Sequence, residues 1–226
     1  MENTTNFQPY RCVLTGGTAE ITEKKSRFIA TVRRTESEEE AVSFIEEMKK
    51  KYWDASHNCS AFVIGRRGQL TRCSDDGEPS GTAGRPMLEV LLGEGICDAA
   101  VVVTRYFGGT LLGTGGLVRA YSGAVKAGLD ASMVITKILG VKLHIETDYT
   151  TFGKIQYILA QRELKILDTV YTDKVELEVL IPKTDVDQVM HAITEGTNAQ
   201  AEMTAGEECY YAEIDGVPTI LEENII

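Results

Sequence analysis

The sequence predicts an α+β protein of two domains, which we place at residues 1–136 and 137–226. Three observations lead to this fold class. The 226 residues are more than one small core needs. The composition, 43% hydrophobic and 25% charged, is that of an ordinary globular protein. Strand-like and helix-like hydrophobic periods alternate along the chain, so we expect helices and strands in both domains.

The second domain has the more regular pattern. A strand is expected at 141–146, where apolar and polar residues alternate, and a helix follows from Asp148, a typical N-cap. A hairpin over 164–181 comes next, then a helix from Asp185 and a last strand within 200–214. The two helices carry apolar residues at spacings of three and four: Tyr149, Phe152, Ile155 and Leu159, then Val186, Val189, Met190 and Ile193. The order β-α-β-β-α-β is typical of a ferredoxin-like domain.

The first domain is less regular. Its expected strands lie at residues 19–21, 26–32, 60–64 and 99–104. The last of these is almost continuously apolar, as a central strand covered on both faces would be. Ser37-Glu38-Glu39-Glu40 has the spacing of a capping box and predicts the start of a helix. The apolar residues of three helices recur at helical spacing: Ala41, Ile45, Met48 and Tyr52; Met87, Leu88, Leu91 and Leu92; and Leu117, Tyr121, Ala124, Val125 and Leu129.

The formal net charge of −11 is unevenly distributed. Residues 1–135 carry 16 basic and 17 acidic side chains, whereas residues 136–226 carry 7 basic and 17 acidic ones. The second domain should repel a phosphate backbone, so we expect any contact with nucleic acid in the first domain. The acidic second domain could instead dock on a basic protein partner.

The sequence shows neither a membrane span nor a cysteine framework. No apolar run reaches eighteen residues, and the N-terminus lacks the charged start and apolar centre of a signal peptide. We therefore expect a cytoplasmic protein without a membrane partner. The five cysteines are scattered and form no CxxC pair, so neither disulfides nor a zinc knuckle are expected. His57-Asn58-Cys59 comes nearest to a ligand pair, but a buried Cys59 thiol is the simpler interpretation.

The segment SDDGEPSGTAGRP, residues 74–86, combines carboxylates and turn-forming residues. Its acids are Asp75, Asp76 and Glu78. These acids could converge on a divalent metal or act in acid–base chemistry beside His57. The alternative is structural, because Asp-Gly and Pro-Ser-Gly are turn sequences and Thr82 could cap the next helix. We favour the structural interpretation, and Ser80 lies outside any GxSxG motif that would support a hydrolase nucleophile.

A second loop, rich in glycine, follows the expected strand at 99–104 and leads into a helix. It begins with Arg105-Tyr106-Phe107, and Arg119 lies one turn into the helix. Its glycines are Gly108, Gly109, Gly113, Gly115 and Gly116. Glycines before a helix N-terminus let a phosphate approach unpaired backbone amides. Thr114 stands where a P-loop needs Lys, and Val118 stands where GxGxxG needs its third glycine, so no nucleotide cofactor is expected.

Two interpretations of the glycine-rich loop stay open. Two guanidinium groups, two aromatic rings and exposed amides are what recognition of a phosphate and a base uses. Alternatively, Tyr106 and Phe107 belong to the core, and the two arginines pair with carboxylates of residues 74–86. Both interpretations hold if such a pair presents an arginine to a ligand.

Four ordered motifs give the chain a family resemblance. They are Ser26-Arg27-Phe28-Ile29-Ala30, Asp54-Ala55-Ser56-His57-Asn58-Cys59, Asp75 to Gly84, and Val103 to Gly109 with Leu117 to Tyr121. Together they resemble the YigZ/IMPACT family. The resemblance implies a first domain similar to the second domain of ribosomal protein S5, and a ferredoxin-like second domain similar to the last domain of elongation factor G. Eukaryotic members are tied to translational control, so the resemblance also implies a role in translation.

We therefore expect a non-enzymatic, translation-associated regulator that binds RNA or the ribosome. The expected contact residues are Lys25, Arg27, His57, Asp75, Asp76, Glu78, Ser80, Thr82, Arg105, Tyr106, Gly108, Gly109, Gly113, Gly115, Gly116 and Arg119. No catalytic residue, metal or cofactor is assigned. Two alternatives stay open: a hydrolase that acts on a small phosphorylated or peptide substrate through residues 74–86, and a protein-interaction module. The sequence indicates no oligomeric state.

Overall fold

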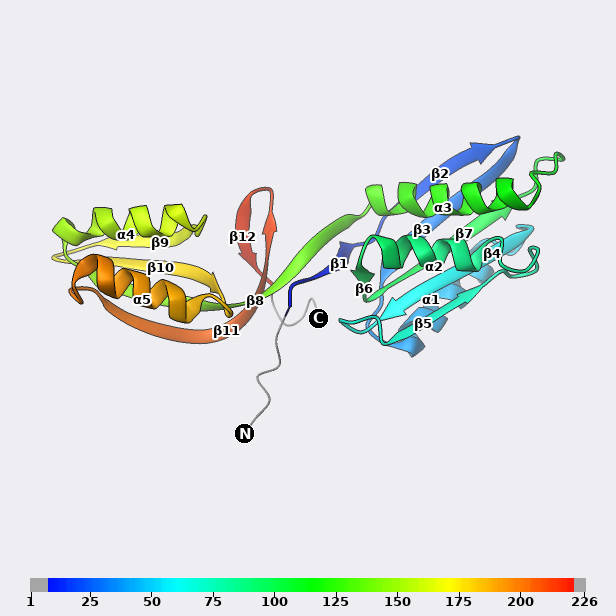
Figure 1. The fold of residues 1–226 in the computed structure, drawn as a ribbon. Helices are drawn as coiled ribbons and strands as arrows, with labels where there is room; N and C mark the ends of the chain where they lie inside the picture. The colour runs from blue at the N-terminus through cyan, green and yellow to red at the C-terminus, as the bar shows by residue number, and fades with distance from the viewer. Residues whose placement is uncertain (1–7, 222–226) are drawn as a thin grey trace. The chain divides into compact units, whose positions relative to one another are not determined.

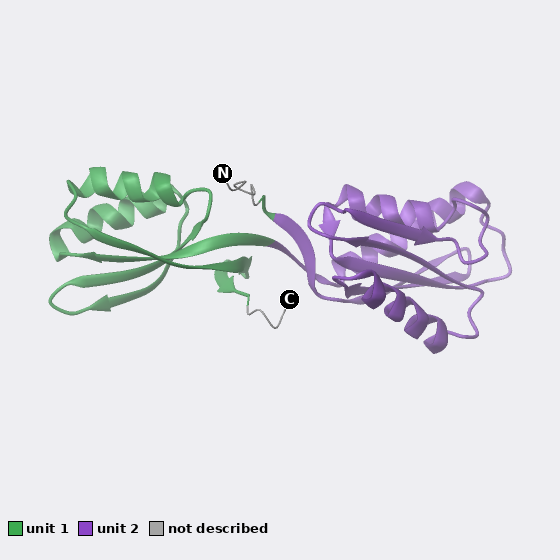
Figure 2. Cartoon of the chain, turned by 90° about the horizontal axis from the view of Figure 1, so that it is seen from below, with its two compact units in different colours: residues 1–9, 137–225 green, residues 10–136, 226 purple. Residues whose placement is uncertain are grey.

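The structure, a computed structural model, describes residues 8–221, which form a mixed α+β fold of five helices and two sheets (Figure 1). The chain divides into two compact units (Figure 2). Tyr10–Thr136 form the N-terminal unit, and Lys137–Ile225 belong to the C-terminal unit. The division lies inside strand β8 (Met133–Thr147), so the chain leaves one unit and enters the other within a strand.

The N-terminal unit is built on a five-stranded antiparallel sheet. Its strand order is β2 (Thr18–Glu23), β3 (Ser26–Arg34), β7 (Ala99–Tyr106), β4 (His57–Ile64) and β5 (Leu70–Ser74). β7 is the central strand, as its apolar sequence predicts. Its register places Arg105 opposite Phe28 of β3 and opposite His57 of β4. The ends of these three strands therefore lie together at one edge of the unit.

Helices cover both faces of this sheet, as Figure 1 shows. Helix α1 (Glu38–Lys51) packs on one face, where it shares a core with Ala100 and Val102 of β7. Helices α2 (Gly84–Gly93) and α3 (Thr114–Asp130) pack on the other face, in the larger core that contains Val101 and Val103. Successive residues of β7 thus enter two different cores, because side chains of a strand alternate between its faces.

Two short strands lie outside the five-stranded sheet. β1 (Tyr10–Thr15) pairs in parallel with β6 (Ile96–Cys97), which contributes only two residues. The sequence pattern predicts neither of them, nor β5, whose residues are mostly exposed and polar and show no apolar alternation. Phe44 of α1 is also buried without having been predicted, and Leu92 of α2 is half exposed although its spacing predicts burial.

The C-terminal unit has the predicted order β-α-β-β-α-β, with one further strand at its end. Five strands run in the order β9-β10-β8-β11-β12, with antiparallel neighbours, and β8 also neighbours β1, so that β1 and β6 complete a seven-stranded sheet. After β8 come α4 (Tyr149–Gln161), β9 (Ile166–Tyr171), β10 (Val175–Pro182), α5 (Val186–Thr197), β11 (Glu202–Ile214) and β12 (Val217–Ile220). Both helices pack their apolar stripes against β8 and β10, except that Tyr149, predicted to belong to the stripe of α4, is 53% exposed. None of the helices in residues 8–221 has the length and apolar composition needed to cross a membrane.

Candidate functional site

Two loops lie close together in the N-terminal unit. The carboxylate loop (residues 74–86) leads from β5 into α2, and the glycine-rich loop (residues 107–113) leads from β7 into α3. An ion pair between Glu78 and Arg105 joins the first loop to the strand that precedes the second. The interpretation in which both arginines pair with carboxylates of residues 74–86 is thus borne out for Arg105, whereas Arg119 has no such partner among the described residues.

Asp75 fixes the carboxylate loop to the start of α2. Its Oδ1 accepts hydrogen bonds from the backbone amides of Ala83 and Gly84, at 3.0 and 2.8 Å, and its Oδ2 accepts one from Gly81 at 2.8 Å. Burial opposes ionisation of Asp75, but the three amides outweigh it, and the pKa of Asp75 lies below its ordinary value. Asp75 therefore serves as the cap of α2.

Asp76 and His57 connect the same loop to β4. Asp76 Oδ2 accepts a hydrogen bond from the backbone amide of Asn58 at 2.7 Å. The carbonyl oxygen of Asp76 lies 2.9 Å from His57 Nδ1. Because a carbonyl only accepts, Nδ1 carries the proton in this bond. The other ring nitrogen, Nε2, lies 3.9 Å from Glu78 Oε2.

Glu78 and Arg105 form a buried ion pair. Their side chains are 3% and 6% exposed, and Arg105 Nη1 donates to Glu78 Oε1 at 2.5 Å. Tyr121 Oη of α3 donates to the same oxygen at 2.8 Å. Arg105 Nη2 lies 3.4 Å from Ser26 Oγ, whereas Arg105 Nε is buried without a partner among the described residues. The carboxylate thus holds the guanidinium in place inside the unit.

Cys59 and Tyr121 close the inner side of this ion pair. Cys59 Sγ lies 3.3 Å from Tyr121 Oη and 3.0 Å from the carbonyl oxygen of Asp75. Burial raises the pKa of Cys59 to about 12, and it raises the pKa of Tyr121 as well. Both groups keep their protons near neutral pH, so Cys59 is a buried thiol, as predicted, and not a thiolate nucleophile.

The glycine-rich loop packs directly on the turn between β2 and β3. A Cβ added at Gly108 would lie 2.1 Å from the backbone carbon and oxygen of Lys25, so no larger residue fits there without a shift of the backbone. The amide of Gly108 also donates to Ser26 Oγ at 3.2 Å. Lys25 is exposed and has a φ of 68°. Its position beside the loop is therefore fixed by backbone packing.

The N-terminus of α3 is open. Its N-cap is Gly113, with a φ of 74°, and neither a capping side chain nor an acidic residue occupies its first turn. Arg119 is exposed and makes no hydrogen bond or ion pair among the described residues. A Cβ added at Gly115 would lie 3.8 Å from Arg119 Nη1, so the guanidinium folds back over the first turn. The unpaired amides and the helix dipole favour an anion at the same place.

Arg27 and Tyr106 are engaged within the protein. Arg27 makes two hydrogen bonds to the carboxylate of Glu20, at 2.8 and 2.9 Å, and its guanidinium carbon lies 5.5 Å from the centre of the Tyr106 ring. Tyr106 Oη donates to Asp54 Oδ1 at 2.8 Å, and this bond raises the pKa of Tyr106. Neither side chain is free to bind a ligand without giving up a partner.

Residues of both loops line a cleft of about 470 Å³. His57, Glu78 and Arg105 form its charged side, and Gly113 and Thr114 bring the start of α3 to it. Its apolar side consists of Pro79, Phe107, Leu111, Leu112 and Leu117. Leu111 is 81% exposed and Phe107 is 49% exposed. A largely apolar cleft with a few polar groups is the usual composition of a ligand site.

The expected contact residues fall into three groups. Those that line the cleft are His57, Glu78, Arg105 and Gly113. Those on the glycine-rich loop, on α3 or packed against them are Lys25, Gly108, Gly109, Gly115, Gly116 and Arg119. The remaining residues neither line the cleft nor belong to the glycine-rich loop or α3, and they are Arg27, Asp75, Asp76, Ser80, Thr82 and Tyr106. Within this last group Ser80 is exposed and makes no hydrogen bond among the described residues.

Three possibilities that the sequence raised for the loops are wrong. Thr82 does not cap α2, because its hydroxyl donates to the carbonyl of Pro79 at 2.7 Å within the preceding turn, and Asp75 takes that role. Phe107 is not a core residue, since half of it is exposed at the cleft. The three acids also do not converge: each has separate partners. Within residues 8–221, no three His, Cys, Asp or Glu side chains are grouped so that they could hold a metal ion.

Sequence reasoning missed part of the site. Tyr121 was expected only as a core residue of a helix, although its hydroxyl bonds to Glu78. Leu111 was not singled out, although a leucine between glycines in a loop is an unusual surface residue. The apolar pair Leu111-Leu112 inside a glycine-rich loop is the signal that could have indicated a cleft wall.

The comparison with known proteins concerns this same part of the chain. The sequence profile described as "Impact N-terminal domain" matches residues 24–129, which contain both loops. The chain is 42% identical over 201 residues to the IMPACT family member YvyE of Bacillus subtilis (strain 168). The matched region covers 89% of this chain and 93% of that protein. The chain belongs to the IMPACT family. The resemblance inferred from the four motifs is thus confirmed.

Further IMPACT proteins and one solved structure are also similar. The family member YigZ of Escherichia coli (strain K12) is 37% identical over 187 residues, 82% of this chain and 92% of that protein. The Protein IMPACT homolog of Dictyostelium discoideum is 36% identical over 97 residues, 41% of this chain and 28% of that protein. Residues 145–200 match a "Domain of unknown function (DUF1949)". A "Crystal structure of an hypothetical protein" is 34% identical with a TM-score of 0.56, covering 89% of this chain and 98% of that one.

Proposed function

We propose that this IMPACT protein is a non-enzymatic, translation-associated regulator that binds RNA or the ribosome through its N-terminal unit. The observation that carries the proposal is the open start of α3 with Arg119 folded over it. The link to translation rests on the family resemblance, which also makes a cytoplasmic location part of the proposal. We further propose that the N-terminal unit is similar to the second domain of ribosomal protein S5, and that the C-terminal unit is ferredoxin-like.

The charges at this site support a contact with phosphate. Arg119 has no carboxylate partner among the described residues, and Lys25 is exposed beside the glycine-rich loop. Unpaired backbone amides at a helix start bind anions, and two cations nearby add electrostatic attraction. Phe107, half exposed at the cleft, offers an aromatic face to an unstacked base. These features form one phosphate-and-base site in the less acidic unit.

The bonds of the carboxylate loop favour binding over hydrolysis. All of its acids have structural partners: Asp75 bonds to three amides, Asp76 to the amide of Asn58, and Glu78 to Arg105 and Tyr121. A general base must reach a substrate proton with a free lone pair. Asp75 and Asp76 would have to give up backbone hydrogen bonds to do so. The hydrolase alternative would therefore have to use Glu78 Oε2 or His57 Nε2, the groups at the cleft that no described residue donates to.

The acidic C-terminal unit favours a second candidate, a protein-interaction module. Residues 136–226 carry 17 acidic and 7 basic side chains, a charge that complements a basic protein surface. Both roles are compatible in one chain, because they use different units. A basic ribosomal protein would satisfy both proposals.

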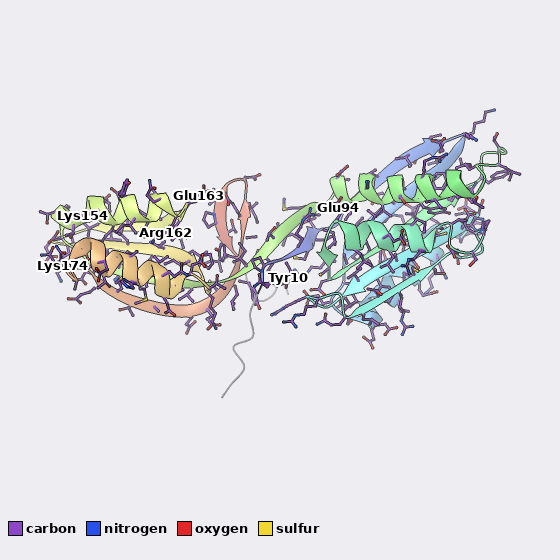
Figure 3. The ribbon with its side chains drawn as sticks, viewed as in Figure 1. Tyr10, Glu94, Lys154, Arg162, Glu163 and Lys174 are labelled. Atoms are coloured by element: carbon purple, nitrogen blue, oxygen red, sulfur yellow. The ribbon has the colours of Figure 1, made fainter. Side chains whose placement is uncertain are left out.

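A salt titration with single-stranded RNA tests the main proposal. Each phosphate contact adds about 0.7 to the slope of log affinity against log salt for a single strand. The variant Lys25→Ala/Arg119→Ala should bind more weakly, with a slope reduced by about 1.4. The matched control is Lys154→Ala/Arg162→Ala, which removes the same two residue types from the C-terminal unit, where both lie on or next to α4 (Figure 3). An unchanged slope in the first variant, or equal losses in both, would count against the proposal.

A further inference from the structure

Glu78 uses only one of its two carboxylate oxygens for hydrogen bonds within the protein. Oε1 accepts hydrogen bonds from Arg105 and Tyr121, whereas no described residue donates to Oε2. Among the described side chains, the buried polar atoms without a partner are Thr35 Oγ1 and Arg105 Nε. Glu78 Oε2 is not one of them, so it is not fully buried, and Glu78 is one of the residues that line the cleft. An almost fully buried carboxylate therefore presents one free acceptor to the cleft.

A second acceptor faces the same point. His57 Nδ1 donates to the carbonyl of Asp76, so in the neutral ring Nε2 is an acceptor. Nε2 and Glu78 Oε2 are 3.9 Å apart, and both residues line the cleft. Two acceptors at this distance attract a group that carries two donor hydrogens. One amino nitrogen can lie about 2.9 Å from each of them, with two bent hydrogen bonds whose N–H···acceptor angles are about 150°, within the usual range.

The rest of the cleft selects the molecule that bears this amino group. Phe107 and Leu111 provide an exposed apolar wall for a flat ring. Gly113 and Thr114 bring the open start of α3, which favours an anion, to the same cleft. Its volume of about 470 Å³ is in the range of cofactor and nucleotide sites. An amino group, a flat apolar ring and an anion occur together in a nucleotide.

We propose that the cleft binds one unstacked nucleotide and selects bases with an exocyclic amino group, namely cytosine, adenine and guanine. The amino nitrogen bridges Glu78 Oε2 and His57 Nε2, the ring lies against Phe107, and the phosphate lies at the start of α3. This inference rests on the proposed RNA binding and adds base selection to it. Uracil carries no amino group, so it can satisfy only one of the two acceptors and leaves the other desolvated.

Binding of the full chain to short oligocytidine and oligouridine of equal length tests the inference. The two ligands have the same backbone and differ only at the C4 substituent, amino in cytosine and carbonyl in uracil, and in the proton that uracil carries on N3. We expect cytidine to bind about tenfold more tightly or better. Phe107→Ala should weaken both ligands, and His57→Phe, which keeps a ring but removes Nε2, should abolish the difference between them. The control Trp53→Ala removes an aromatic residue that is 83% exposed and does not line the cleft, and it should change neither affinity.

Three outcomes separate the inference from the proposed function. If neither oligonucleotide binds, the proposed RNA binding fails and the inference fails with it. If both oligonucleotides bind equally, and His57→Phe leaves the ratio of their affinities unchanged, RNA binding stands and base selection is overturned. Free leucine carries an ammonium group, which could bind to the same two acceptors. If leucine displaces oligocytidine at equal concentration, the two acceptors serve an ammonium group, and the nucleotide assignment is overturned. Thermal unfolding of each variant verifies that it is folded before binding is compared.

Discussion

Glu78 combines two functions in one carboxylate. Its Oε1 neutralises Arg105 in a place where both side chains are almost fully buried, and its Oε2 is free at the cleft. Moving both charges out of water costs free energy, which their mutual attraction offsets. Removal of one partner therefore leaves the other charge buried and unpaired. The pair was one of two interpretations that the sequence left open. Sequence alone does not decide between them, because the contact depends on how two distant loops fold.

The first prediction concerns this ion pair. Glu78→Gln should lower the free energy of unfolding by about 3–5 kcal/mol, because the guanidinium of Arg105 stays buried without its counter-charge. Urea denaturation at neutral pH measures the effect. The control is Glu89→Gln, which breaks an exposed pair with Arg85 one turn apart on α2 and should change the midpoint little. Equal effects of the two substitutions would show that Glu78 contributes no more than a surface charge.

The second prediction concerns Asp75 and pH. Asp75→Asn should lower stability at neutral pH by about 0.5–2 kcal/mol, as loss of a helix cap does. Because folding lowers the pKa of Asp75, its charge stabilises the folded state above the ordinary value of 3.8, and this contribution is lost as pH falls through the lower folded pKa. The difference between wild type and Asp75→Asn should therefore shrink below about pH 4. A difference that stays constant down to pH 2 would contradict the capping role of the charged form.

At the scale of elements, the sequence pattern predicted the features that depend on residues close together in the chain, such as helix caps and apolar stripes. The stripe of α3 is buried at all five expected positions, and Asp148 caps α4 by accepting from the amides of Thr150 and Thr151. The strands that were missed, β1, β5, β6 and β12, are short or exposed, so their sequences carry little alternation. They form because a neighbouring strand offers hydrogen-bonding groups, and that partner is set by the tertiary fold.

The third prediction concerns a glycine inside α4. Gly153→Ala should raise the free energy of unfolding by about 0.5–1 kcal/mol, because alanine loses less backbone entropy in a helix and a Cβ at this position meets no atom within 4 Å. Gly196→Ala in α5 is the matched control, since its Cβ would lie 2.6 Å from Ile158 Cδ1. Thermal unfolding should show a gain for the first variant and a smaller gain or a loss for the second. A loss in Gly153→Ala would mean that α4 needs the glycine for another reason.

At the scale of the whole molecule, charge and chemistry are divided between the two units. The N-terminal unit carries the cleft, the open helix start and exposed Lys25 and Arg119, and the C-terminal segment carries most of the net negative charge. The sequence predicted the charge division, because charge is additive along the chain. It did not predict the cleft, because the lining residues come from β4, β7, α3 and both loops, and only the register of the central strand brings them together.

The start of α3 and its surroundings form the proposed RNA site. Amide chemical shifts of the full chain, recorded by NMR while a single-stranded oligonucleotide is added, test it most directly. The largest changes should fall on Thr114 to Leu117, the glycine-rich loop and Lys25, with residues 137–221 nearly unchanged. Changes confined to residues 137–221, or none near α3 when binding is saturated, would contradict the account.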